Sequence, residues 1–286
     1  MDLRRLQLFL AVAEHGGFTR AASAVFISQP ALSQGIKELE AELGVKLFHR
    51  LGRRVSLTSA GEALLGPARQ ALRDVEAGRM AVESVLGLQS GRLDLGSLPS
   101  LAADPLATMV GAFRRSHTGV TVIVSSPRNP AELVRLLQEG VCELGITEAF
   151  EVPKSLTSIP LVTQEMVAVL PPGTEPTSDP FSLEELAKLP IVSTPMGTST
   201  RRALDEAFAR AGLTAHVAVV SAQRDAILPM VLAGAGAAIL PRSIASTPPE
   251  HGATVLGLHP KITREIVIAH RPAVLSPAAA AFIAAA

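Results

Sequence analysis

Polar side chains that can read DNA bases fall on one side of a short segment, Ser28–Leu43. Its apolar residues recur at helical spacing and predict a buried stripe made of Leu32, Ile36, Leu39 and Leu43. The residues left for the outer face are Gln29, Ala31, Ser33, Gln34 and Lys37. A glutamine can bond an adenine edge, a serine can bond a base or a phosphate, and a lysine can meet a phosphate. This face therefore suits a helix lying in the major groove of DNA.

A cluster of cations follows that segment. It consists of Lys46, Arg50, Arg53 and Arg54, which surround a glycine and precede the β-prone run Val55–Leu57. A hairpin of this kind beside a recognition helix would place its cations over neighbouring phosphates. A basic cluster alone is more often only a solvated face. Its position directly after the polar helix favours a DNA-contacting wing.

Two short helices must position this reader. The stretch Thr19–Ala24 predicts a helix of small residues with Thr19 as its N-cap, and an interruption follows at Val25–Ile27. Ser28 then opens the second helix, which has Pro30 in its first turn.

Residues 1–60 resemble the N-terminal domain of the LysR-type transcriptional regulators. The matching pieces are LRRLQLFLAVAEHGGFTRAA, SQPALSQGIKELEAELGVKLFHR and RRVSLTSAG. The resemblance implies a winged helix-turn-helix over residues 1–58 that binds double-stranded DNA at an interrupted inverted repeat. With the polar face and the wing, it predicts DNA contacts from Thr19, Ser28, Gln29, Pro30, Ser33, Gln34, Lys37, Arg50, Arg53 and Arg54. One departure from the family pattern is Gly35, which stands in a helix interior where a residue such as Gln or Ala would be more usual. A glycine there costs roughly 0.5–1 kcal/mol relative to alanine.

Composition limits the remaining choices. The chain has 286 residues, enough for about two domains. Residues 1–60 hold eight Lys and Arg against five Asp and Glu, a net of +3, and residues 91–286 hold 15 against 17, a net of −2. A basic head on a mildly acidic body fits a DNA reader with a separate sensing part. Cys142 is the only cysteine, which excludes a disulfide, a cysteine zinc cluster and the paired-cysteine peroxide switch known in some LysR-type regulators.

A long helix is expected to connect the head to the rest of the chain, over residues 59–88. Ser59-Ala60-Gly61-Glu62 fits the capping-box pattern at its start. An apolar seam with 3,4 spacing follows, made of Leu65, Ala68, Leu72, Val75, Val82 and Leu86 and interrupted by Arg79. Either this helix packs on its own domain, or it pairs two subunits as a coiled coil. A reader of palindromic DNA needs a twofold partner, which favours dimerisation through the seam.

Beyond the glycine-bounded break Gly87–Gly91, short apolar runs alternate with helical stretches over residues 91–286. This alternation predicts an α/β body of parallel βαβ units. It resembles the effector domain of the same family, two α/β lobes similar to periplasmic binding proteins. By that resemblance lobe I covers about 91–161 and 268–286, lobe II covers about 162–267, and the subunits form a homotetramer built as a dimer of dimers. The Ala-rich ending Ser276–Ala286 predicts a helix that packs back on lobe I.

Hydroxyl side chains at strand ends and helix starts mark a candidate ligand cleft between the lobes. The expected effector-binding residues are Ser97, Ser100, Thr147, Thr198, Ser199, Thr200 and Gln223, and Arg224 is expected to approach from the second lobe. Hydroxyls and free N–H groups at a helix start favour an anion, typically a carboxylate. Each hydroxyl taken singly is more simply read as a helix cap. Two such groups on facing lobes favour an anionic effector.

The function predicted from these features is a LysR-type, sequence-specific transcriptional regulator that responds to a small molecule, with RNA polymerase as a further partner to consider. The charged N-terminal helix is not a signal peptide, and no stretch reaches the ~20 apolar residues of a membrane span, so we expect a cytoplasmic protein. An enzyme is the alternative, but the seven histidines are scattered and no nucleophile elbow, Walker loop or paired-carboxylate motif appears. We therefore expect no catalytic residues, no metal and no cofactor. A solute receptor is a third alternative, and the basic head counts against it.

Overall fold

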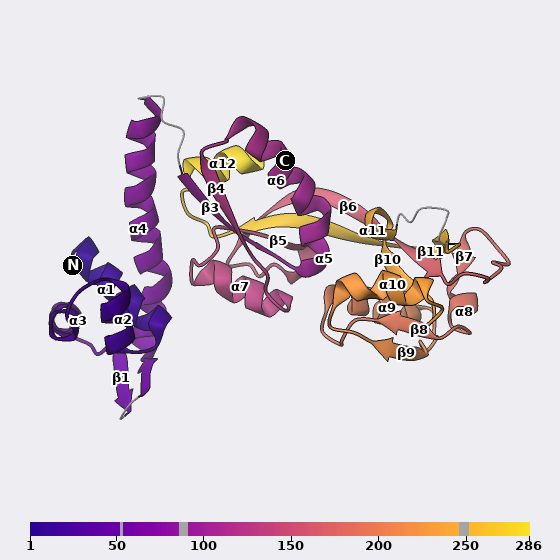
Figure 1. Cartoon of the computed structure of the whole chain (residues 1–286), viewed down its shortest axis with the longest axis horizontal. Helices are drawn as coiled ribbons and strands as arrows, with labels where there is room; N and C mark the ends of the chain where they lie inside the picture. The colour runs from indigo at the N-terminus through magenta and orange to yellow at the C-terminus, as the bar shows by residue number, and fades with distance from the viewer. Residues whose placement is uncertain (52–53, 86–90, 246–251) are drawn as a thin grey trace.

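The computed structural model describes residues 1–51, 54–85, 91–245 and 252–286. A small helical head lies at one end of the molecule, beside the long helix α4 (Ser59–Val85). The C-terminal body extends away from α4 as two lobes joined by long strands (Figure 1). This is the winged helix-turn-helix, linker helix and two-lobe α/β body that the sequence predicts.

The head contains three helices and a two-stranded wing. Its elements are α1 (Leu3–His15), α2 (Phe18–Ala24), α3 (Gln29–Leu43), β1 (Phe48–Leu51) and β2 (Arg54–Leu57). The helices share one core, in which Phe9, Val12, Leu32, Ile36 and Leu39 are fully buried. The two strands of the wing pair antiparallel, with Phe48 opposite Leu57.

The helix boundaries in the head correct two details of the prediction. Helix α2 begins at Phe18 with Gly17 in the N-cap position, so Thr19 lies inside the helix and does not cap it. Ser28 does cap α3, because its hydroxyl accepts a hydrogen bond from the Ala31 amide at 3.3 Å. Leu43 is 39% exposed and lies outside the buried stripe, whose last turn is filled by Glu40 instead.

The start of α4 also differs from the prediction. The hydroxyl of Thr58 accepts a hydrogen bond from the Gly61 amide at 3.1 Å and donates one to the Lys46 carbonyl at 2.6 Å. Thr58 therefore caps the helix, and the proposed Ser59–Glu62 capping box is wrong. A cap that also bonds Lys46 fixes α4 to the base of the wing.

Both lobes are built on one mixed sheet with the strand order β10-β6-β11-β5-β3-β4. Its strands are β3 (Gly91–Ser97), β4 (Val120–Ser125), β5 (Leu144–Glu148), β6 (Thr157–Leu170), β10 (Ala238–Pro241) and β11 (Thr254–His270), and β7 (Phe181–Ser182) pairs with β11. Strands β3, β4 and β5 run parallel, as predicted for lobe I. The expectation of parallel units throughout is wrong, because β6 pairs antiparallel with both β10 and β11.

The long strands β6 and β11 pass from one lobe to the other (Figure 1). Residues Val162 and Ile266 are paired on the lobe I side, where Ile266 also pairs with Glu148 of β5. Residues Met166 and Ile262 are paired on the lobe II side, where Met166 also pairs with β10. The crossing thus occupies only the few residues between these pairs, with Gln164 opposite Arg264.

Helices cover the sheet in both lobes. Lobe I carries α5 (Pro99–Leu101), the π-helical turn η1 (Ala102–Leu106), α6 (Ala107–Ser116), α7 (Pro130–Gln138), the 3-10 turn η2 (Ala149–Glu151) and α12 (Pro277–Ala284). Lobe II carries α8 (Leu183–Leu186), α9 (Ser199–Arg210), the 3-10 turn η3 (Arg224–Ala226), α10 (Ile227–Leu232), α11 (Arg242–Ala245) and the parallel pair β8 (Ile191–Ser193) and β9 (Val217–Val220). The predicted C-terminal helix is confirmed, since Phe282 of α12 packs edge-on against Phe113 of α6.

Candidate functional site

The outer face of α3 presents the polar side chains expected to read DNA. Gln29, Pro30, Gln34 and Lys37 are exposed, and Ser33 is half-buried. Gln34 donates a hydrogen bond to Glu38 one turn later, at 2.9 Å. Because Gln34 is already engaged, Gln29 in the first turn is the amide most free to reach a base edge. The DNA contacts themselves remain predictions.

Only two cations of the predicted cluster, Arg50 and Arg54, lie on the described strands of the wing. Arg50 lies on β1 opposite Val55, and Arg54 lies on β2 opposite Leu51. Arg53 lies outside the described residues. Lys46 is engaged within the head, where its ammonium bonds Glu40 at 2.8 Å. Lys46 therefore links the start of the wing to α3, and its contact with a phosphate stays a prediction.

Glu40 is a structural residue of the head that the sequence pattern did not reveal. Its side chain is 6% exposed, and Oε1 accepts a hydrogen bond from the Leu47 amide at 3.0 Å. Burial acts to raise the pKa of Glu40, but the bonds from Lys46 and Leu47 outweigh it and leave that pKa below its ordinary value. Its carboxylate therefore holds the end of the recognition helix against the start of the wing.

Helix α4 is engaged on two sides within its own chain. Leu65 and Ala68 are buried in the core of the head, and Leu72 packs at its edge. The assignment of Leu65 and Ala68 to a seam between subunits is therefore corrected, because the head already covers their apolar surface, whereas that of Leu72, which is partly buried, stays a prediction. Val75 is 51% exposed and is still available for a partner. The side chain of Val82 and the whole of Leu86 lie outside the described residues.

Arginines tie α4 to lobe I. Arg69 donates to the carbonyl of Glu139 at 2.9 Å, and Arg73 donates to the carbonyl of Gly140. Arg271, which follows β11, donates to Gln70 at 2.6 Å. Burial lowers the pKa of Arg73 to about 10, and the neighbouring Arg271 acts in the same direction, so Arg73 remains a cation at neutral pH. Hydrogen bonds from arginine side chains to carbonyl oxygens thus connect the linker helix to lobe I.

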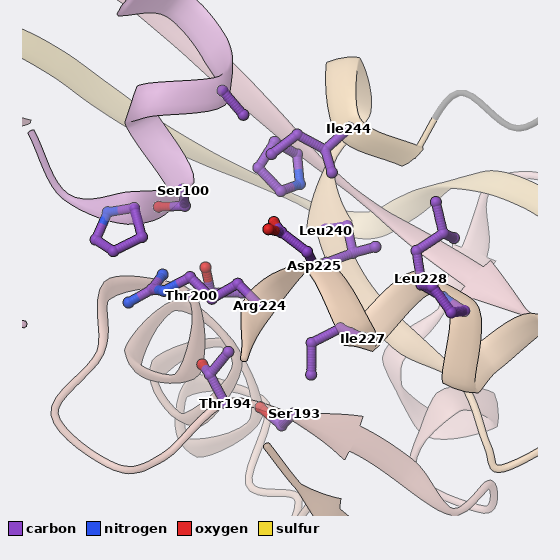
Figure 2. Close-up of a pocket in the computed structure, with 14 residues that line it drawn as sticks. Ser100, Ser193, Thr194, Thr200, Arg224, Asp225, Ile227, Leu228, Leu240 and Ile244 are labelled. Carbon is purple, nitrogen blue, oxygen red and sulfur yellow. The ribbon is translucent and has the colours of Figure 1, made fainter. Parts of the chain in front are cut away.

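A cavity of about 340 Å³ lies between the two lobes (Figure 2). Lobe I contributes Pro99, Ser100 and Ala103. Lobe II contributes the rest of the lining, which is Ser193, Thr194, Thr200, Arg224, Asp225, Ile227, Leu228, Pro229, Leu240, Pro241 and Ile244. A second cavity of about 440 Å³ shares Pro99 and Arg224 with the first and continues toward Ser126, Arg128 and Thr198. Arg224 therefore stands where an inner and an outer chamber meet.

The predicted effector residues are only partly brought together by this cavity. Ser100 and Thr200 line the inner chamber and Thr198 lines the outer one. Ser97, Thr147 and Ser199 are buried in the fold, and Ser199 accepts a hydrogen bond from Arg264 at 3.2 Å. Gln223 lies outside the lining of both chambers. Its neighbour Arg224 lines both of them instead.

Thr198 lines the outer chamber without capping α9 through its side chain. It occupies the N-cap position of α9, yet its hydroxyl accepts no hydrogen bond from an α9 amide. Instead it bonds the hydroxyl of Thr194 at 2.6 Å and donates to the Pro195 carbonyl at 2.8 Å. Two hydroxyls of the loop before α9 are thus turned toward one another beside the cavities. The apolar part of the lining was missed because Ile227, Leu228, Leu240 and Ile244 read in the sequence as ordinary core residues.

A charged network that the sequence reasoning also missed joins the lobes beside the cavity. Glu148, at the end of β5 and 3% exposed, accepts a hydrogen bond at 2.9 Å from Arg202 of α9 in lobe II. Arg202 also meets Glu151 at 3.4 Å and lies 3.6 Å above the ring of Phe150. Arg264 approaches the other oxygen of Glu148 at 3.6 Å. One buried carboxylate is therefore shared by two arginines from different elements.

The hinge strands are held by a second polar chain. Arg264 donates from Nε to Gln164 at 2.9 Å, and Gln164 donates to the Asp104 carboxylate of lobe I at 2.7 Å. Asp104 also accepts a hydrogen bond from Ser243 of lobe II at 2.5 Å. The polar side chains on the hinge strands thus form hydrogen bonds with one another and with Asp104. Without these bonds, burying their polar atoms would be costly.

Other chemistries find no support among the described residues. No group of three or more His, Cys, Asp or Glu side chains in that part of the chain could hold a metal ion. Cys142 is fully buried, and burial raises the pKa of its thiol. Within the same residues, no helix is long and apolar enough to cross a membrane.

Comparison with known proteins agrees with this architecture. The chain matches the bacterial regulatory helix-turn-helix model of the lysR family over residues 3–62 and the LysR substrate binding domain over residues 86–286. YnfL, an uncharacterized HTH-type transcriptional regulator of Escherichia coli K12, is 32% identical over 249 residues, which cover 85% of this chain and 83% of that protein.

Two solved structures share the fold. A full-length OxyR variant from Pseudomonas aeruginosa matches with a TM-score of 0.81 at 24% identity, over 100% of this chain and 94% of that one. Full-length CbnR in complex with its target DNA matches with a TM-score of 0.66 at 24% identity, over 100% of this chain and 98% of that one. By its two family domains and its relatives, the chain belongs to the LysR family of transcriptional regulators, with a DNA-binding helix-turn-helix head and an effector-binding body.

Proposed function

We propose that this regulator binds a small anionic effector in the cavity between its lobes, and that effector binding changes the position of its DNA-binding heads on the DNA. The observation that carries the proposal is the cavity itself, where the hydroxyls of Ser100 and Thr200 and the guanidinium of Arg224 converge from opposite lobes (Figure 2). A ligand that contacts both lobes has a different affinity for each of their relative positions. Such a difference is what a ligand needs in order to shift a conformational equilibrium.

The proposed route from the cavity to the head runs through lobe I. Ser100 follows β3, and lobe I is fastened to α4 through Arg69, Arg73 and Arg271. A displacement of lobe I would thus be passed to α4, which is packed on the head through Leu65 and Ala68. We propose that the chain acts as a homotetramer in the cytoplasm, on an interrupted inverted repeat of double-stranded DNA, and carries out no catalysis.

The experiment compares the full-length chain with a variant whose cavity is filled, Ala103→Trp. A library of anionic, neutral and cationic small molecules is screened by thermal shift, and each hit is then tested for a change in the DNase I footprint on a selected DNA site. We expect at least one compound to stabilise the wild-type chain, to fail with Ala103→Trp, and to alter the footprint. If no compound of any charge gave this pattern, the cavity would not be an effector site.

A further inference from the structure

Arg224 is a half-buried arginine that has no ion-pair partner among the described residues. Its Nη1 is buried and has no hydrogen-bond partner, and no carboxylate of the described residues lies within ion-pair distance of it. Burial lowers the pKa of Arg224, and no acidic group acts against that change. An arginine nevertheless stays charged at neutral pH. A guanidinium that is partly removed from water and left unpaired is costly unless something else supplies the anion.

The charged groups nearby do not supply that anion. Arg264 is almost fully buried nearby, where burial lowers its pKa and the Arg224 guanidinium lowers it further, against the attraction of Glu148. Glu148 is shared between Arg202 and Arg264, and so it is not available to Arg224. Arg224 therefore has no ion-pair partner among the described residues on this side of the cleft.

The position of Arg224 shows where the negative charge of a ligand would be placed. In Figure 2 the polar ends of Ser100, Thr200 and Arg224 lie together on one side of the cavity. The hydroxyl of Ser100 is buried and has no hydrogen-bond partner in the structure, and Ser100 is only 6% exposed. A fork of guanidinium donors with hydroxyl donors beside it matches the two oxygens of one carboxylate.

The opposite side of the cavity has a different character. Ile227, Leu228, Leu240 and Ile244 lie there, away from the guanidinium (Figure 2). Apart from Arg224, no Lys, Arg or His belongs to the described lining of this chamber. Its one acidic group, Asp225, lies between the polar and the apolar sides in Figure 2. A second anionic group on the ligand would find no cation in the chamber and would be repelled by Asp225.

We propose that the effector is an amphipathic monocarboxylate, whose carboxylate binds Arg224, Ser100 and Thr200 and whose apolar body fills the chamber of Ile227, Leu228, Leu240 and Ile244. This inference rests on the proposed function and narrows it from anions in general to one class. It excludes dicarboxylates and neutral amides of the same shape as preferred ligands.

The test uses the full-length chain and matched probes. Octanoate and benzoate are compared by isothermal titration calorimetry with their amides, octanamide and benzamide, and with the dicarboxylates of matching skeleton, suberate and terephthalate. We expect at least one monocarboxylate to bind, and both of its counterparts to bind about 10- to 100-fold more weakly, the range of a charged hydrogen bond left unmade. Arg224→Gln should remove the preference of the chain for the acid over its amide, and Arg224→Lys should restore part of it.

Arg210→Gln is the matched control, since Arg210 is an exposed arginine of α9 outside both chambers, and it should leave binding unchanged. The proposal is overturned if a dicarboxylate or an amide binds as tightly as its monocarboxylate, if Arg224→Gln binds the acid normally, or if neither monocarboxylate binds. In each of these cases the proposed function still stands if another compound in the library is blocked by Ala103→Trp and alters the footprint. It fails separately when no compound of any charge does so.

Discussion

Gly35 of α3 lies so close to Leu8 of α1 that a Cβ on Gly35 would stand 2.6 Å from Leu8 Cδ1. Leu8 is buried, and Gly35 belongs to the buried face of α3. The glycine that departs from the family pattern is therefore explained by close packing between α1 and the recognition helix. The glycine costs roughly 0.5–1 kcal/mol in helix propensity, and this cost allows α1 and α3 to pack closely at Leu8 and Gly35.

We expect Gly35→Ala to lower the free energy of unfolding by about 1–2 kcal/mol. The overpacking of a buried contact, about 1–3 kcal/mol, exceeds the gain in helix propensity. Urea unfolding of the full chain, followed by circular dichroism, measures the change. In a Leu8→Ala background the clash is absent, and there Gly35→Ala should stabilise by about 0.5–1 kcal/mol. The same sign in both backgrounds would show that Leu8 does not determine the choice of glycine.

Glu40 should make the stability of the head depend on pH. Because its pKa is below the ordinary value in the folded chain, it stabilises the fold at pH values above its unfolded pKa of about 4.5, and this stability is lost as the pH falls through the folded pKa. Glu40→Gln removes that dependence. Thermal unfolding between pH 7 and pH 3 should show a smaller loss in the variant than in the wild type, with the variant less stable at pH 7. Parallel curves would contradict the role given to Glu40.

Much of the head could be predicted from its sequence for a physical reason. A helix buried on one side repeats its apolar residues at a fixed spacing, so the outer face of α3 follows directly from Leu32, Ile36 and Leu39. The reason for Gly35 could not be predicted, since it depends on how closely α1 approaches across the core. A sequence shows which face is buried, but not which neighbour covers it.

The same limit explains the error at α4. A 3,4 apolar seam arises whether a helix packs on its own domain or on a partner, because both bury the same stripe. Leu65 and Ala68 satisfy the pattern inside the head. The full length of β6 could not be predicted from the sequence, because polar residues at the hinge, Gln164 among them, interrupt its apolar run. Their side chains are paired across the strands, which no local pattern reveals.

The base-reading role of Gln29 gives a test on DNA. We expect Gln29→Ala to weaken binding by about 1–3 kcal/mol at one preferred base and to relax specificity there. Arg53→Ala should instead weaken binding to all sequences and flatten the salt dependence, as the loss of a phosphate contact would. Affinities measured on a panel of single-base variants at several salt concentrations separate the two effects. If Gln29→Ala left both affinity and base preference unchanged, Gln29 would not be a reader.

Arg202 should hold the lobes together before any ligand binds. Arg202→Gln leaves the buried carboxylate of Glu148 with only Arg264 at 3.6 Å, and we expect a loss of about 1–3 kcal/mol in the free energy of unfolding of the body. Hydrogen exchange should rise in α9 and η2, the two segments that Arg202 connects. Arg210→Gln, on the same helix, serves as the control. Equal exchange in both variants would mean that Arg202 does not hold the lobes together.

Val75 is the described part of the predicted subunit seam that the head does not cover. If α4 pairs two subunits, a charge at this half-exposed position is desolvated in the dimer and left without a partner, which opposes association. We therefore expect Val75→Asp to shift the chain toward smaller oligomers in sedimentation velocity, and to weaken DNA binding because both half-sites must be occupied together. Val220→Asp is the matched control, since Val220 is 55% exposed and lies on β9 in lobe II, away from α4 (Figure 1). An unchanged oligomer in Val75→Asp would place the subunit contact elsewhere on the molecule, and the two heads would then have to be paired through the body.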